Sequence, residues 1–95
     1  MAKEKISMYY IDKVEKGKSC ANQLFREHSI NFHTLMRRGI KGYPDFQLVL
    51  ITFSKEEEAS LDECFEKLHQ KFPEEVLKGD LSIEKILREN LVVLN

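Results

Sequence analysis

The hydrophobic pattern of the chain switches between the two-residue period of a β-strand and the 3.6-residue period of an α-helix. Alternation predicts strands over residues 5–14 and 30–38. An unbroken apolar run predicts a third strand over residues 46–53. Because both faces of that strand are apolar, we expect it at the centre of a sheet, covered on both sides. Strict alternation in the second strand places two sets of side chains on opposite faces: Phe32, Thr34 and Met36 on one, and His33, Leu35 and Arg37 on the other.

Two segments predict helices that pack against these strands. Residues 20–28 follow Ser19, a residue type that favours the N-cap position of a helix. Residues 54–72 begin with Ser54 and Glu57, which have the S-x-x-E spacing of a capping box. The apolar stripe of the second helix has a spacing of 3.6 residues and consists of Leu61, Cys64, Phe65, Leu68 and Phe72.

The order of the elements favours an α+β fold. A loop over residues 39–44 is expected between the second and third strands, and the end of the chain predicts a short helix over residues 82–90 and a strand over residues 91–95. We therefore predict a single domain, residues 1–95, with the βαββαβ topology of a ferredoxin-like sandwich. In this topology two main helices cover one face of a four-stranded antiparallel sheet, strands one and three are central, and the short C-terminal helix is an addition.

Composition narrows the classes of function. The chain carries 15 basic and 16 acidic residues, a net charge of −1, so the whole molecule is not attracted to nucleic acid or to an anionic membrane. An anion site would have to be local. Cys20 and Cys64 fall at apolar positions and indicate buried free thiols in a reducing compartment. No signal peptide and no apolar run of about 20 residues is present, and we expect a cytoplasmic, soluble protein.

One face of the predicted sheet has no helix to cover it. Two helices cover only one face, so large apolar groups of the first and third strands are expected to remain bare on the other. This favours a homo-oligomer, a dimer or trimer, that associates through the sheet. The alternative is that the C-terminal helix folds over that face.

Two basic segments with glycines are candidate sites for a small anionic ligand. One precedes a predicted helix N-terminus, where free amides attract anions, and the other offers arginines that bind phosphate or carboxylate. The alternative for both is a solvated turn. His28, His33 and His69 lack the spacing of a metal site, and we predict no catalytic residue and no metal ligand; the sequence does not indicate which cofactor, if any, is bound. The predicted ligand-binding residues are Lys16, Gly17, Lys18, Arg37, Arg38 and Lys41.

The segment DKVEKGKSCANQLFREHSINFHTLMRRGIKG, residues 12–42, resembles small ferredoxin-like regulators, the P-II-type signalling proteins and the ACT domains. These families share a first strand, a glycine turn, a helix, and a second strand that runs into a Gly/Arg stretch. The resemblance covers roughly residues 5–72 and implies an oligomer that binds ligands in clefts between subunits. The corresponding residues would be Lys16, Gly17 and Lys18 in the glycine turn, and Arg37, Arg38 and Gly39 at the end of the second strand.

These observations favour a non-enzymatic regulatory or ligand-sensing domain that acts as a homo-oligomer. One alternative is a protein-interaction adaptor that uses the exposed apolar face of the sheet. A second is a single-stranded RNA-binding domain, because KGYPDFQLVLITF, residues 41–53, faintly resembles a motif of RNA-recognition domains. An enzyme is the least supported class.

Overall fold

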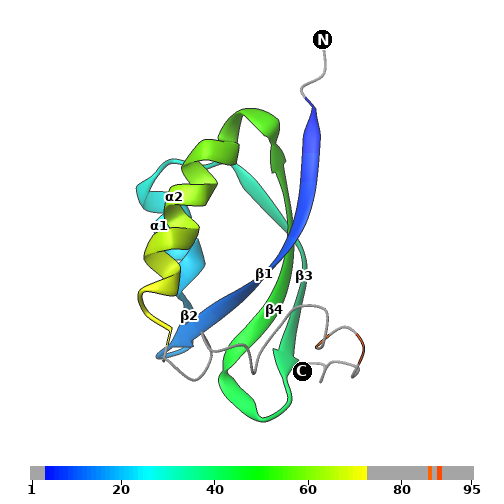
Figure 1. Cartoon of the computed structure of the whole chain (residues 1–95), viewed down its shortest axis with the longest axis vertical. Coiled ribbons are helices and arrows are strands. Elements are labelled where there is room, and N and C mark those ends of the chain that lie inside the picture. The colour runs from blue at the N-terminus through cyan, green and yellow to red at the C-terminus, as the bar shows by residue number, and fades with distance from the viewer. Residues whose placement is uncertain (1–3, 73–85, 87, 89–95) are drawn as a thin grey trace.

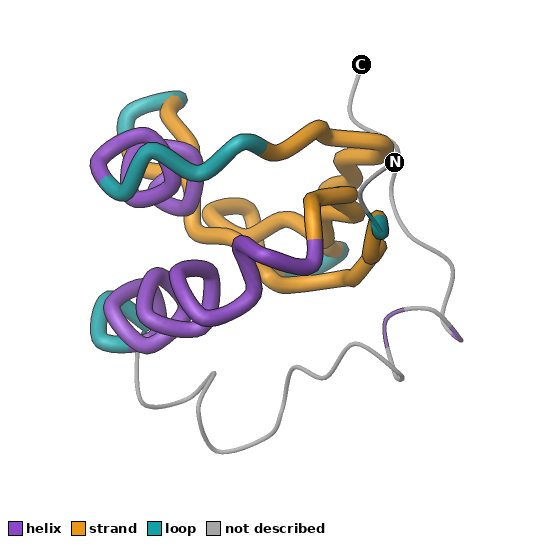
Figure 2. The backbone as a smooth tube through the Cα atoms, turned by 90° about the horizontal axis from the view of Figure 1, so that it is seen from above, coloured by secondary structure: helices purple, strands orange, loops and turns teal. Residues whose placement is uncertain are grey.

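The computed structural model describes residues 4–72 together with Ile86 and Arg88. These residues form an α+β domain with a curled, four-stranded antiparallel sheet and two α-helices (Figures 1 and 2). The elements are β1 (Lys5–Glu15), β2 (Lys18–Ser19), α1 (Cys20–Glu27), β3 (Phe32–Ile40), β4 (Tyr43–Ser54), the 3₁₀ turn η1 (Lys55–Glu57) and α2 (Glu58–His69). Apart from Ile86 and Arg88, the predicted short helix over 82–90 and the predicted strand over 91–95 lie outside the described residues.

The strand order is β2-β1-β4-β3, and every neighbouring pair is antiparallel. β4 pairs with β1 on one side, from Phe46 to Ser54, and with β3 on the other. Leu48, Val49 and Ile51 of β4 are 0% exposed, which confirms the prediction that this strand is central and covered on both faces. The fourth strand of the described sheet is the two-residue β2, which pairs only with Val14 and Glu15.

A tight turn joins β1 to β2 and leads directly into α1. Lys16 and Gly17 both have positive φ angles, 52° and 76°, as in the two-residue type I′ turns that match the twist of a hairpin. Ser19 then caps α1, because its Oγ accepts a hydrogen bond of 3.0 Å from the backbone N–H of Asn22. The glycine turn and the serine cap are as the sequence predicts.

Aromatic rings join both helices to one side of β1. The ring of Tyr10 contacts Phe25 of α1 and Phe65 of α2, at centroid distances of 5.8 and 5.3 Å. Phe25 also meets Phe32 of β3 at 4.9 Å. We call this side of the sheet the Tyr10 face, and the other side the Leu48 face. Register places Asp12 and Gln47 on the Tyr10 face, because they oppose each other two positions from the Tyr10–Val49 pair.

A β-bulge in β3 reverses the facing that strict alternation predicts. Thr34 opposes Ile51, and Met36 opposes Leu50, the neighbour of Ile51 in β4. Leu35 therefore has no opposing residue and is the extra residue of the bulge. Leu35 is 53% exposed. Beyond the bulge Arg37 opposes Val49 on the Tyr10 face. The prediction that Phe32 and Met36 share a face opposite Arg37 is therefore wrong, since one additional residue shifts the alternation.

The hairpin between β3 and β4 is tighter than expected. Ile40 pairs with Tyr43, so the predicted loop over residues 39–44 is reduced to Lys41 and Gly42, with Gly42 at φ 85°. Pro44 lies within β4 and has no amide donor. The pairing of β4 with β1 ends at Phe46, so Pro44 lies beyond it. The missing N–H of Pro44 therefore costs the β1–β4 ladder no hydrogen bond.

The predicted capping box does not form. Ser54 is the last residue of β4, paired with Lys5, and its side chain makes no cap hydrogen bond. The chain passes through η1 before α2 begins at Glu58, and α2 ends at His69. Strand pairing at Ser54 thus delays the helix by four residues. None of the described helices has the length and apolar character needed to span a membrane.

The Leu48 face is partly buried within the chain itself. Phe46 is 6% exposed and Leu48 is 0% exposed. The ring of Phe72, which follows α2, contacts Phe46 at a centroid distance of 5.3 Å. The expectation of a bare apolar face is therefore not met at Phe46 and Leu48. The partly buried residues around the core include Tyr9, Ile11 and Met36.

Candidate functional site

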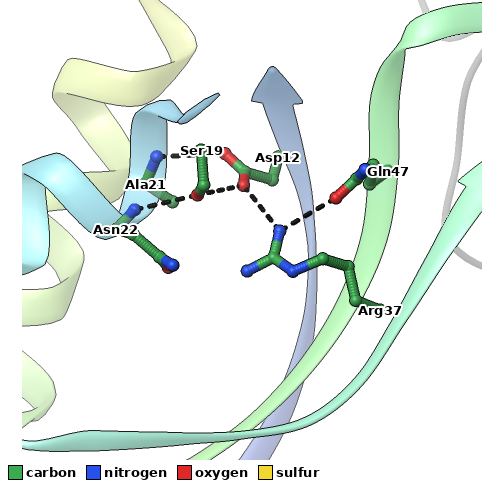
Figure 3. Close-up of polar contacts among 6 residues, drawn as sticks. All are labelled: Asp12, Ser19, Ala21, Asn22, Arg37 and Gln47. Carbon is green, nitrogen blue, oxygen red and sulfur yellow. Dashed lines mark hydrogen bonds and ion pairs between the residues drawn. The ribbon is translucent and has the colours of Figure 1, made fainter. Parts of the chain in front are cut away.

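Asp12 is the buried charged residue of the described part of the chain, with 0% exposure. Its carboxylate accepts hydrogen bonds from three donors (Figure 3): the hydroxyl of Ser19, the backbone N–H of Ala21 at 3.0 Å, and Nη1 of Arg37 at 3.2 Å. Sequence analysis did not identify Asp12 as a site residue. The signal was present, since Asp12 continues the inward series of Met8 and Tyr10, and a charge in an apolar register indicates a buried pair.

The carboxylate of Asp12, a residue of β1, helps to cap the N-terminal end of α1. Ser19 Oγ donates to Asp12 Oδ2 and accepts from Asn22 N–H, while Oδ1 of Asp12 accepts from Ala21 N–H. Both backbone amides belong to the first turn of the helix, which has no intrahelical partners for them. A negative charge is also favourable at this end of the helix dipole. The free amides that the sequence suggested for an external anion are thus engaged by the protein's own side chains.

Arg37 joins this cluster from β3 and is held in a fixed orientation. Nη1 donates to Oδ2 of Asp12 at 3.2 Å and to Oε1 of Gln47 at 2.9 Å. The other terminal nitrogen of the guanidinium points toward the side chain of Asn22 (Figure 3). Asp12 is fully buried whereas the Arg37 side chain is 28% exposed, so one edge of the ion pair reaches solvent.

Tyr10 adds a neutral polar group beside this ion pair. Its hydroxyl is buried and has no hydrogen-bond partner among the described residues. Burial raises the pKa of Tyr10 well above its usual range; the negative charge of Asp12 raises it further, and Arg37 opposes the shift. The phenol therefore stays protonated at neutral pH, where it acts as a packing group.

Two adjoining pockets open at the N-terminal end of α1. The inner pocket, of about 240 Å³, is lined by Val14, Gly17, Ser19, Asn22, Arg37 and Gln47. The outer pocket, of about 280 Å³, is lined by Lys18, Ser19, Asn22, Gln23 and Arg26. Ser19 and Asn22 line both, so the two form one groove. Oδ1 of Asn22 is buried and has no hydrogen-bond partner in the described residues.

The six predicted ligand-binding residues are distributed over several places. Gly17 and Arg37 meet in the inner pocket although they come from different predicted segments, and Lys18 lines the outer pocket. Lys41 lines a separate pocket of about 410 Å³ at the β3–β4 hairpin, which the inner pocket adjoins only at Gln47. The other two, Lys16 and Arg38, line none of these three pockets.

Arg37 and Arg38 project from opposite faces of the sheet, which explains part of this distribution. Arg38 pairs with Leu48 and therefore projects from the Leu48 face, whereas Arg37 projects from the Tyr10 face. Arg26, which was not named from the sequence, lines the outer pocket from the last turn of α1. It lies four residues after Asn22, so helical periodicity places both on the same side of α1.

The cysteines and histidines occupy other parts of the fold. Cys20 and Cys64 are buried free thiols, as predicted, and burial raises the pKa of both. Cys64 Sγ donates to the carbonyl of Leu24 at 3.6 Å and so links α2 to α1. Within residues 4–72 and at Ile86 and Arg88, no three His, Cys, Asp or Glu side chains gather as metal ligands would.

Comparison of the chain with protein-family models, with curated proteins and with solved structures finds no significant match.

Proposed function

We propose that the chain is a non-enzymatic regulatory domain that binds a small anionic ligand in the groove formed by the inner and outer pockets. The observation that carries this proposal is the fixed guanidinium of Arg37. Asp12 and Gln47 hold its Nη1, and Arg37 lines the inner pocket. A preoriented arginine at a pocket wall reduces the entropy lost when a ligand binds.

The charge of the groove supports an anion as the ligand. The carboxylate of Asp12 offsets the charge of Arg37 within the cluster. Lys18 and Arg26 in the outer pocket then supply the excess positive charge, and both have flexible side chains suited to a carboxylate or phosphate. Among the described residues, no acidic side chain lines either pocket.

The complete fold that we propose is the ferredoxin-like sandwich. β1 and β4 occupy the inner positions of the described strand order, and β1 is paired by β2 only at Val14 and Glu15. An edge of β1 is therefore free, within the described residues, to receive the predicted strand over 91–95. We further propose that the domain acts as a homo-oligomer and that ligand binding favours one arrangement of subunits over another. Light scattering at two protein concentrations tests this, and a monomer at both would refute the oligomer.

The adaptor alternative has less support, because burial of Phe46 and Leu48 reduces the apolar area that a partner could cover on that face. RNA binding likewise lacks a specific observation in its favour.

Titration with succinate and, separately, with inorganic phosphate, followed by ¹⁵N–¹H correlation spectra, tests ligand binding. We expect shifts of the backbone signals of Lys18, Ser19 and Asn22. The double substitution Lys18→Gln and Arg26→Gln should weaken binding about tenfold or more, since two charge-assisted contacts are lost. The matched control is Arg38→Gln with Lys41→Gln, which removes the same charge outside the groove. Equal loss of affinity in both variants, or no shifts in the groove, would refute the proposal.

A further inference from the structure

We infer that the ligand of the groove is an amphipathic anion, with an acid group at one end and an aromatic or other bulky apolar group at the other. The acid group would lie in the groove at the N-terminal end of α1. The apolar group would lie in the pocket at the β3–β4 hairpin, which we call the hairpin pocket. This inference rests on the proposed function and specifies the chemical class of the ligand.

The hairpin pocket lies beside the inner pocket on the Tyr10 face of the sheet. On β4, Gln47 lines both pockets. On β3, Arg37 lines the inner pocket and Gly39 lines the hairpin pocket. These two residues lie two positions apart in the strand, so they share a face and are separated by about 7 Å. The two pockets are therefore neighbours along two adjacent strands, and one small molecule can extend from one pocket to the other.

The wall of the hairpin pocket is mainly apolar. Besides Lys41 and Gln47, the described residues that line it are Gly39, Ile40, Gly42, Tyr43 and Pro44. Tyr43 is half-buried and Pro44 is exposed, so a ligand can reach both. An apolar group placed against this wall removes apolar surface from water. An aromatic ring can in addition pack edge-to-face or offset against the ring of Tyr43.

The distribution of charge sets the orientation of the ligand. Lys18 and Arg26 both line the outer pocket, whereas Lys41 is the cation that lines the hairpin pocket among the described residues. Lys41 is exposed at the tip of the hairpin, where its ammonium group remains in water and its carbon chain adds apolar surface. The acid group is therefore attracted more strongly to the groove, and the apolar group is better accommodated by the hairpin pocket.

The test compares an acid without a ring, butyrate, with two acids that carry one, 4-phenylbutyrate and 6-phenylhexanoate. The two phenyl acids differ in the length of chain between acid and ring. Affinities come from ¹⁵N–¹H correlation spectra of the full chain. We expect butyrate to shift the backbone signals of Lys18 and Ser19, and the better phenyl acid to shift those of Gly42 and Tyr43 as well. The ring should strengthen binding about tenfold or more, because it is removed from water.

The substitution Tyr43→Ser removes an apolar part of the hairpin pocket. It should reduce the affinity for the better phenyl acid to near that for butyrate and leave the affinity for butyrate unchanged. The matched control is Tyr9→Ser, the same change at another half-buried tyrosine of the sheet. Tyr9 opposes Leu50 on the Leu48 face and lines none of the three pockets, so this variant should keep the gain from the ring. Dispersed spectra verify folding, and the comparison of ligands in the wild-type protein tests the inference even if a variant unfolds.

Three results would overturn the inference. If neither phenyl acid binds more tightly than butyrate, or if the gain from the ring survives Tyr43→Ser, the amphipathic ligand is wrong and the anion-binding function stands. If butyrate and both phenyl acids leave the signals of Lys18 and Ser19 unshifted, the acid group does not bind in the groove, and the inference and the proposed function both fail.

Discussion

The substitution Asp12→Asn removes one negative charge from the interior and keeps the size of the side chain. An asparagine oxygen can still accept from Ala21 N–H, but its amide N–H₂ then faces Nη1 of Arg37, which is also a donor. Removing one partner of a buried ion pair costs about 3–5 kcal/mol. Because 28% of the Arg37 side chain is exposed and water can solvate it, we reduce this term to roughly 2 kcal/mol.

The substitution also replaces the charge-assisted hydrogen bond from the Ser19 hydroxyl to the carboxylate by a weaker contact with an amide. This adds roughly 1 kcal/mol to the loss of stability. The expected decrease in the free energy of unfolding is therefore about 3 kcal/mol. A domain of this length has a total stability of about 5–14 kcal/mol, so the variant should fold but be clearly less stable.

Urea denaturation followed by circular dichroism at 222 nm measures this loss, because the chain has no tryptophan to report by fluorescence. With a slope of about 1 kcal/mol per M, the midpoint should fall by roughly 3 M at unchanged slope. Asp45→Asn makes the same chemical change at an exposed position of the β3–β4 hairpin and should change stability by less than about 0.5 kcal/mol. If Asp12→Asn behaves like this control, Asp12 does not hold the cluster together.

Three further substitutions probe other parts of the structure. Tyr10→Phe removes a buried hydroxyl without a partner and should leave stability at pH 7 unchanged or higher by up to about 1 kcal/mol. Because the pKa of Tyr10 is raised in the folded protein, the unfolded chain releases a proton above pH 10 that the folded protein keeps. The stability of the wild-type protein, measured by urea titration, should therefore fall above pH 10 more steeply than that of the variant. Lys16→Asn should stabilise by about 0.5–1 kcal/mol in the same assay, because asparagine tolerates the positive φ of this turn. Phe25→Ala should lower the thermal midpoint through a loss of about 3–5 kcal/mol, whereas Leu35→Ala at an exposed position should have little effect.

The local elements could be predicted because their signals lie in neighbouring residues. Period-two runs correspond to β1 and β3, the unbroken apolar run corresponds to β4, and the apolar stripe marked α2. The turn at Gly17 and the cap at Ser19 have specific local chemistry, and both form. The capping box at Ser54 failed because strand pairing, a long-range interaction, continues through that residue.

The candidate site could be predicted only in part, because its contacts cross the fold. Arg37 and Gly17 were named from the sequence as members of two separate basic segments, and nothing local indicated that one pocket would contain both. The pair of Asp12 and Arg37 is separated by 25 residues and depends on β4 lying between β1 and β3. It depends also on the bulge, which periodicity alone does not reveal.

The bulge at Leu35 makes β3 tolerant of a change in chain length at one position. If the codon for Leu35 were deleted, Met36 would follow Thr34 directly, and the present pairs of Met36 with Leu50 and of Arg37 with Val49 would persist in a regular strand. A deletion between Gln47 and Phe53 of β4, where every residue has a partner in β1, has no extra residue to absorb it and would reverse the facing of every side chain on one side of the gap. Homologous chains that differ by one residue at this point could therefore retain the same arginine beside the buried carboxylate.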